Sequence, residues 1–145
     1  MTEHLTDPIS RQPVLVVEDD QAIQRLIAAT LRRENISVVV ASNGAEAIEK
    51  LAAESFAMLT LDLMMPEVSG WEVIEWLRRN PSRRAASVTV ISAADESIFH
   101  KLDPTIVNAV FIKPFDVAAL GAYIKATLGR TPDRRRRRVV SASFV

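Results

Sequence analysis

Unbroken apolar runs alternate along this chain with segments in which apolar residues recur every three or four positions. The runs are short and rich in β-branched side chains, which is typical of parallel strands buried on both faces. They cover residues 14–17, 36–41, 56–61, 87–91 and 109–112. Four of them are followed by a segment with helical spacing, and the apolar stripes of these segments lie within residues 23–31, 45–52, 71–77 and 120–128.

The connection between the fourth and fifth runs is different, because Pro104 interrupts it. We expect a short helix over about residues 96–102 and then a separate turn. Five strands that alternate with helices predict an α/β fold. It is a doubly wound, five-stranded parallel sheet with helices on both faces and right-handed crossovers.

Polar residues at the predicted helix starts support this division. Asn43 with Glu46, and Ser69 with Glu72, have the spacing of a capping box. Asp116 is placed to cap the last helix. We expect these side chains to bind backbone N–H groups in the first turn of their helices.

The composition is that of a globular protein, with 48% hydrophobic and 25% charged residues among 145. There is no cysteine, which excludes disulfides and thiolate metal sites and fits a reducing cytoplasm. No run approaches the roughly 18–20 apolar residues that cross a bilayer. We therefore expect a soluble, cytoplasmic protein with one domain over residues 13–129 and a flexible N-terminus over residues 1–12.

Charge is unevenly distributed, although the net charge is zero. Residues 130–145 contain six arginines and one aspartate, which gives +5, so residues 1–129 sum to −5. A basic block of this kind is usually solvated, and we expect residues 130–145 to be a disordered tail. The alternative is that its five consecutive arginines bind nucleic acid or an anionic membrane surface, but no aromatic residue interleaves them.

Chemically active side chains follow four of the predicted strands. Ligands of an open parallel sheet gather beyond the carboxyl ends of its strands, so these side chains are expected to meet there. Converging carboxylates repel one another unless a cation lies among them, and oxygen ligands without nearby histidine or cysteine favour Mg²⁺. The residues are Glu18, Asp19 and Asp20 after the first strand, Asp62 after the third, Ser92 after the fourth and Lys113 after the fifth.

Asp62 is the candidate nucleophile, because a buried strand carries it directly into this site. A phosphoryl group that arrives at its carboxylate needs its charge met by a metal ion, an ammonium group and a hydrogen-bond donor. Mg²⁺, Lys113 and Ser92 would supply these. The alternative is that Asp19 and Asp20 only cap a helix. Ser92 and Lys113 would then be ordinary surface residues.

Four motifs together resemble the receiver domain family of two-component response regulators. They are VLVVEDD at 14–20, LDLMMP at 61–66 with Gly70, VISA at 90–93 and KPF at 113–115. The resemblance covers residues 13–128 and implies a flavodoxin-like fold with strand order 2-1-3-4-5. It also implies a signalling switch that takes a phosphoryl group from a histidine kinase or a histidine phosphotransfer protein and then changes its partner-binding surface.

The resemblance implies a metal site and a phosphoacceptor. Glu18 and Asp19 become the acid pair that positions Mg²⁺. Asp62 becomes the phosphoacceptor and a metal ligand. The backbone carbonyl of Met64 becomes a further metal ligand.

The resemblance also implies how the switch works. Ser92 becomes the hydroxyl that turns toward the phosphoryl group, Lys113 the lysine that contacts it, and the peptide before Pro114 is implied to be cis. The family places an aromatic switch residue three positions before the lysine, where this chain has Val110. Phe111 lies one residue later. Either it takes the role through a shifted register, or the aromatic half of the switch is absent.

Three rival functions match parts of this pattern. The runner-up is a metal-dependent phosphatase or phosphotransferase with an aspartyl nucleophile. Haloacid-dehalogenase-like enzymes of this kind carry a second acid two residues after the nucleophile, where Met64 stands here. A nucleotide-binding module needs a glycine-rich phosphate loop, which the four glycines do not build. A binding module that had lost phosphorylation would lack an acid or the lysine, and all of them are present.

The expected protein is thus a switch that catalyses only its own phosphoryl transfer and dephosphorylation. Its downstream target is not visible in the sequence, because no effector domain follows residue 129. Either the chain is a stand-alone receiver that acts through protein contacts, or it is part of a longer chain that was cut in its arginine-rich linker.

Overall fold

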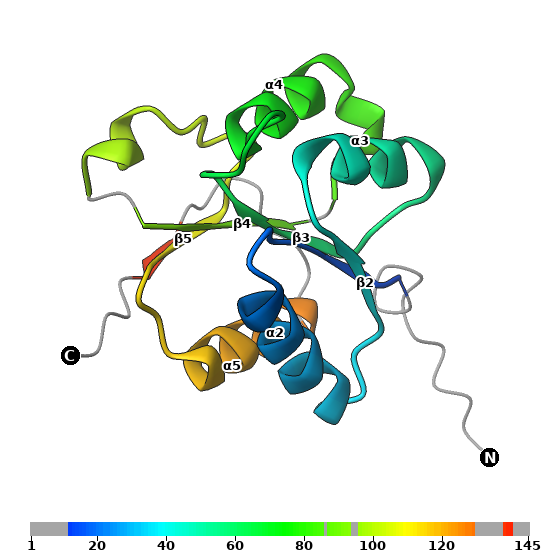
Figure 1. The fold of residues 1–145 in the computed structure, drawn as a ribbon, viewed down its shortest axis with the longest axis vertical. Helices are drawn as coiled ribbons and strands as arrows, with labels where there is room; N and C mark the ends of the chain where they lie inside the picture. Colours follow the sequence, from blue (N-terminus) through cyan, green and yellow to red (C-terminus); the bar gives the residue numbers. More distant parts are fainter. Residues whose placement is uncertain (1–11, 86, 94–95, 130–137, 141–145) are drawn as a thin grey trace.

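The computed structural model describes residues 12–85, 87–93, 96–129 and 138–140. A parallel sheet lies between two layers of helices (Figure 1). The flexibility expected of residues 1–12 concerns a stretch of which only Gln12 is described. Of the expected disordered tail, residues 130–145, only 138–140 are described.

Five strands form where the apolar runs predict them. They are β1 (Val14–Val17), β2 (Val38–Ala41), β3 (Met58–Asp62), β4 (Ser87–Ser92) and β5 (Ala109–Ile112). The strands pair in parallel in the order β2-β1-β3-β4-β5, which confirms the predicted α/β fold and strand order. Every residue of β1, β3 and β4 is buried, because helices cover both faces of the centre of the sheet.

A sixth strand, β6 (Arg138–Val140), extends the sheet beyond β5 and was not predicted. It runs parallel to β5, with Val139 opposite Val110. These three residues belong to the tail for which the sequence predicts disorder, and for them the structure differs from that prediction. Without β6, β5 would be an edge strand. The unpaired backbone N–H and C=O groups of an edge strand can pair with a further segment of the chain.

The helices form one layer on each face of the sheet. The α-helices are α2 (Gln21–Arg33), α3 (Gly44–Ala53), α4 (Gly70–Arg79) and α5 (Val117–Leu128), and the 3₁₀ helices are η1 (Pro81–Arg83) and η2 (Glu96–His100). Helices α2 and α5 cover one face, and α3 and α4 cover the other (Figure 1). None of the helices among the described residues is long and apolar enough to cross a membrane.

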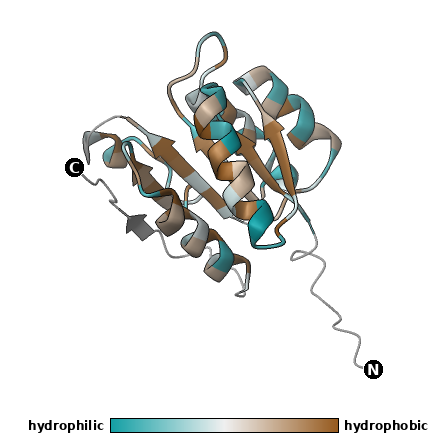
Figure 2. Ribbon diagram, turned by 60° about the horizontal axis from the view of Figure 1, so that its bottom comes forward, coloured by the Kyte–Doolittle hydropathy of each residue, from teal (hydrophilic) through white to brown (hydrophobic). Residues whose placement is uncertain are grey.

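Two hydrophobic cores result from the alternation of side chains along the strands. In β1, Leu15 and Val17 face α3 and α4, whereas Val14 and Val16 face α2 and α5. The central strands are accordingly hydrophobic along their length, while the helices carry polar residues on their outer sides (Figure 2). Because the strands are buried on both faces, their ends are held in fixed positions. The polar residues that directly follow the strands are therefore also held in place.

The predicted caps form in two of three cases. Asn43 Oδ1 accepts a hydrogen bond from the Glu46 N–H at 2.8 Å, and Glu46 Oε1 accepts one in return from the Ser42 N–H at 3.1 Å. Asp116 Oδ1 accepts one from the amide two residues further on. The cap predicted at Ser69 is wrong, since its side chain makes no capping hydrogen bond. Sequence spacing does not determine the side-chain rotamer that a cap needs.

The fourth crossover contains the 3₁₀ helix η2 in place of an α-helix, followed by the expected turn at Pro104. In that turn, Asp103 Oδ1 accepts a hydrogen bond from the Thr105 N–H at 2.9 Å. Ile98 and Ile106 are buried on either side of the turn and join the core beneath α3 and α4. The fourth crossover therefore consists of a 3₁₀ helix and a turn, where the other crossovers of the sheet contain an α-helix.

The loop between β3 and α4 is pressed against the end of β3. The Gly70 N–H donates to the Leu63 carbonyl at 3.1 Å. A Cβ atom at Gly70 would lie only 2.3 Å from the Asp62 carbonyl oxygen, so any larger residue would push the loop away from the strand. This close approach determines how the chain leaves Asp62.

Candidate functional site

Three strands end at the same edge of the sheet beside a charged side chain. Glu18 follows β1 directly, and Asp62 is the last residue of β3. Lys113 follows β5. Parallel strands bring their carboxyl ends to one edge, so residues that lie far apart in the sequence become neighbours. The structure thus brings together the two acids and the lysine that the sequence singles out.

Glu18, Asp19 and Asp62 form an acidic group in which one oxygen of each lies within 4.8 Å of the others. Glu18 and Asp62 are 1% and 3% exposed, whereas Asp19 is exposed. Two buried carboxylates with a third on the solvent side offer the oxygen ligands that Mg²⁺ prefers, together with a path of entry. The donor set therefore fits the predicted metal.

Lys113 supplies the positive charge of this cluster. Its Nζ atom lies 3.0 Å from Glu18 Oε1 and donates a hydrogen bond to Asp62 Oδ2 at 3.4 Å. Its side chain is 19% exposed, so water screens both ion pairs only in part. Burial lowers the pKa of Lys113, but its contacts with Glu18 and Asp62 outweigh that effect and raise it above the ordinary value. The lysine is therefore charged at neutral pH.

The ion pair with Lys113 stabilises the charged form of Glu18 only in part. The buried Oε1 atom of Glu18 lies 3.0 Å from the Lys113 ammonium, which Glu18 shares with Asp62. Burial first, and then the neighbouring carboxyl of Asp62, raise the pKa of Glu18 to about 7. A buried carboxyl group that shares a single ammonium group with a second carboxyl group is one that a further cation would stabilise.

The three consecutive residues at the end of β1 have separate roles. Asp20 caps α2, because its Oδ1 atom accepts hydrogen bonds from the Ala22 and Ile23 N–H groups at 2.9 and 3.2 Å. Its own N–H donates to Glu18 Oε2 at 3.2 Å. Capping is therefore the correct interpretation for Asp20. It does not hold for Asp19, whose side chain belongs to the acidic group.

Asp62 has a different partner for each oxygen. Its Oδ1 atom accepts a hydrogen bond from the Met64 N–H at 3.1 Å, and its Oδ2 atom accepts one from Lys113. The Met64 side chain is exposed, with 63% of its surface accessible. The predicted role of the Met64 carbonyl as a metal ligand stays a prediction.

Ser92 lies at the end of β4 and is fully buried. It pairs with Ile112 of β5, and its carbonyl accepts a hydrogen bond from the Lys113 N–H at 2.7 Å. Ser92 is therefore linked through the backbone to the lysine that contacts Asp62. The peptide between Lys113 and Pro114 is cis, as the resemblance implied.

The structure decides between the two readings of the aromatic position before Lys113. Val110 lies in the core beneath α3 and α4, while Phe111 lies on the other face of β5. There Phe111 is fully buried, and its ring lies 5.7 Å from that of Tyr123 in α5. The register of β5 against β4 therefore keeps Phe111 on the face opposite Val110, and the shift that would move it there is not present.

Sequence reasoning missed Gln24, which organises the turn that carries the acids. Gln24 lies on α2 and is 8% exposed. Its Nε2 atom donates to the Glu18 carbonyl at 3.0 Å and to the Ala41 carbonyl at 3.2 Å, so it ties the end of β1 to the end of β2. The available signal was a polar residue within the apolar stripe of a helix.

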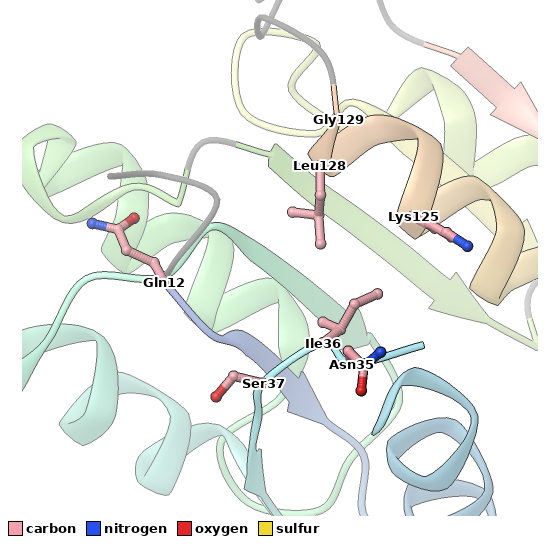
Figure 3. Close-up of a pocket in the computed structure, with 7 residues that line it drawn as sticks. All are labelled: Gln12, Asn35, Ile36, Ser37, Lys125, Leu128 and Gly129. Carbon is pink, nitrogen blue, oxygen red and sulfur yellow. The ribbon is translucent and has the colours of Figure 1, made fainter. Parts of the chain in front are cut away.

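A separate surface hollow of about 420 Å³ lies at the opposite, amino-terminal edge of the sheet (Figure 3). Its lining includes Asn35, Ser37 and Lys125. The ammonium of Lys125 is already paired with Glu34 at 2.7 Å. The hollow contains none of the converging acids, so it plays no part in their chemistry.

The family model for the response regulator receiver domain matches residues 14–125. The chain therefore belongs to the response regulator receiver domain family and is a signalling protein of two-component systems. The alternative of an aspartyl phosphatase or phosphotransferase finds no support in this match.

Two curated relatives agree with this assignment. Response regulator ArlR of Staphylococcus epidermidis is 31% identical over 123 residues, which are 83% of this chain and 54% of that protein. The uncharacterized transcriptional regulatory protein YkoG of Bacillus subtilis is 32% identical over 117 residues, which are 79% of this chain and 50% of that protein. The chain spans about half the length of the curated relatives it matches.

Solved structures show the same fold. The signal receiver domain of a response regulator from Bermanella marisrubri superposes with a TM-score of 0.70 at 35% identity, over 79% of this chain and 95% of that one. TrrA from Thermotoga maritima, in complex with Mg²⁺–BeF, superposes with a TM-score of 0.68 at 25% identity, over 79% of this chain and 97% of that one.

Without divalent cations, Glu18 should make the protein less stable as the pH rises. Its pKa is raised from 4.5 to about 7 in the folded protein, so the folded state binds this proton more tightly. The free energy of unfolding should therefore fall between these two pH values, by on the order of 3 kcal/mol from this group. Glu18→Gln cannot titrate and should lose this part of the slope. Urea unfolding in a chelator, on either side of the window, measures it, and identical slopes in both proteins would contradict the account.

Proposed function

We propose that the chain is a Mg²⁺-dependent switch that becomes phosphorylated on Asp62. The observation that carries the proposal is the contact of one buried carboxylate, Asp62, with the Lys113 ammonium at 3.4 Å, next to two further acids. A carboxylate oxygen would attack the phosphorus atom, and the bond from phosphorus to the donor atom would break. Lys113 would meet the charge of the transferred group.

The donor in this proposal is a histidine kinase or a histidine phosphotransfer protein. Its phosphohistidine would lose the phosphoryl group to Asp62, and water would later hydrolyse the acyl phosphate. The chain itself would catalyse both steps through the residues around Asp62. We place this exchange in the cytoplasm, which agrees with a chain that contains no cysteine.

Glu18, Asp19, Asp62 and the Met64 carbonyl would hold the metal ion. Bound there, Mg²⁺ would neutralise the negative charge of the carboxylates and of the arriving phosphoryl oxygens. Support comes from two buried carboxyl groups that share one ammonium group and from the complex of the similar protein TrrA with Mg²⁺–BeF. Asp19 is the acid best placed to admit the ion, because it is exposed.

The switch would start at Ser92 and Lys113. The phosphoryl group would draw the Ser92 hydroxyl toward it, which favours one of two conformations that already exchange. Because the Lys113 N–H is bonded to the Ser92 carbonyl, movement at either residue reaches the ends of β4 and β5 together. With Val110 at the usual aromatic position, this response would proceed without an aromatic ring on that face of β5.

Acetyl phosphate with Mg²⁺ should add one phosphoryl group to the wild-type protein, and Asp62→Asn should reduce incorporation to background. Asp20→Asn is the matched control, because asparagine also caps helices and Asp20 lies outside the acidic group. It should accept phosphate as the wild type does. Intact mass measurement followed by peptide mapping gives the result. A phosphorylated peptide that maps to Asp19 or Asp20 would rule out Asp62 as the acceptor.

Mg²⁺ should raise the melting temperature, because an ion that binds the folded state stabilises it. The stabilisation is about 1.4 kcal/mol at ten times the dissociation constant. Asp19→Asn should weaken Mg²⁺ binding, on the order of tenfold, since it removes one charged ligand. Asp20→Asn should leave the binding unchanged. Thermal unfolding across a Mg²⁺ titration checks this, and an unaltered response in Asp19→Asn would remove that residue from the site.

A further inference from the structure

The side chain of Gln24 is buried between α2 and the ends of β1 and β2. Its Nε2 amide donates to the Glu18 carbonyl at 3.0 Å, to the Ala41 carbonyl at 3.2 Å and to Ser42 Oγ at 3.2 Å. The two N–H groups of this amide are thus shared among three acceptors. Because Gln24 is only 8% exposed, water does not readily replace the donor where the amide is lost. The amide therefore holds the backbone segments around it together.

These bonds continue the ladder between β1 and β2 beyond its last paired residues. The Glu18 N–H donates to the Ala41 carbonyl at 3.1 Å. In a parallel ladder, the next bond would run from the Asn43 N–H to the Glu18 carbonyl. Asn43 is instead the N-cap residue of α3, and that bond does not form among the described residues. In this part of the chain, the Gln24 side chain supplies the donor that the backbone does not.

The anchored carbonyl belongs to a residue of the acidic group. The carboxylate of Glu18 lies beside Asp62 and Lys113, and Asp19 is the next residue of the chain. The bond from Gln24 therefore fixes the backbone from which both acids of the pair extend. These acids repel each other, so a turn without this anchor can relax and let them move apart. A metal ion would then have to restore their positions when it binds, which lowers its affinity.

The connection between β2 and α3, to which Gln24 is bonded through Ser42, also contacts the loop after β3. The Gly44 N–H donates to the Val68 carbonyl at 3.2 Å. A Cβ atom at Gly44 would lie only 2.3 Å from that carbonyl oxygen, so the two segments are in close contact. Val68 lies in the loop between β3 and α4, the second backbone segment of the proposed metal site. Gln24 thus ties the first segment to a connection that already holds the second.

We propose that Gln24 is a positioning residue for the metal site, and that its amide sets the affinity of Glu18 and Asp19 for Mg²⁺ without contacting the ion. This inference rests on the Mg²⁺ site of the proposed function and adds to it a residue outside the acidic group. The contact between Asp62 and Lys113 does not involve Gln24. Gln24 therefore acts on the binding of the ion, and the chemistry at Asp62 is the same once the ion is bound.

Isothermal titration calorimetry of the full chain with Mg²⁺ tests this role. Gln24→Met keeps the length of the side chain but removes the donor, and it should bind Mg²⁺ about tenfold more weakly than the wild type. Gln21→Met is the matched control and should bind as the wild type does, because Gln21 is an exposed residue of the same helix. Equal affinities of Gln24→Met and the wild type would overturn the inference. A wild type that binds no Mg²⁺ would refute the metal site itself, and the inference with it.

The Mg²⁺ dependence of phosphorylation by acetyl phosphate separates positioning from a loss of stability. In Gln24→Met, the Mg²⁺ concentration for half the maximal rate should rise about tenfold, while the rate at saturating Mg²⁺ should stay within about twofold of the wild type. A lower saturating rate with an unchanged half-maximal concentration would contradict the positioning role. Circular dichroism checks that the variants are folded. If Gln24→Met does not fold, Gln24→Asn replaces it with the same expected and contradicting results, because its amide is one methylene shorter.

Discussion

One partly buried ammonium group, that of Lys113, controls the arrangement of the site. It lies 3.0 Å from Glu18 and 3.4 Å from Asp62, two carboxylates that are almost completely removed from water. Two such charges repel each other, and the burial of each is costly without a partner. A single lysine partly offsets both costs, and in doing so it joins the ends of β1, β3 and β5. The raised pKa of Glu18 shows that the compensation is incomplete. That deficit is what a divalent cation would relieve.

The rest of the site keeps this unfavourable cluster in place. Gln24 fixes the turn after β1 through two backbone carbonyls, and Asp20 starts α2 immediately after the acids. Gly70 lets the chain fold back closely against the end of β3. Each of these residues stabilises a backbone position, so that the acids cannot relax away from one another. The repulsion between the acids therefore persists in the folded protein.

The sequence was sufficient for most of the sheet and for the converging charges, because both follow from simple periodic patterns. Unbroken apolar runs mark strands that are buried on both faces, and residues directly after such strands must meet at one edge. Features that depend on tertiary contacts were predicted less well from the sequence. Ser69 has the spacing of a cap but makes no capping bond, and Gln24 acts through carbonyls of two strands that no local pattern connects. The strand Arg138–Val140 depends on the free edge of β5, which the basic composition around it does not reveal.

The central claim is that Lys113 neutralises Glu18 and Asp62 together, and a double-mutant cycle measures this most directly. Urea unfolding in a chelator above neutral pH would compare the wild type with Lys113→Met, Glu18→Gln and the double variant. Lys113→Met should lose about 2–4 kcal/mol, because it leaves two buried carboxylates without a cation. Glu18→Gln in the same chain should recover at least about 1 kcal/mol of that loss. Losses that simply add, with no recovery in the double variant, would contradict the claim.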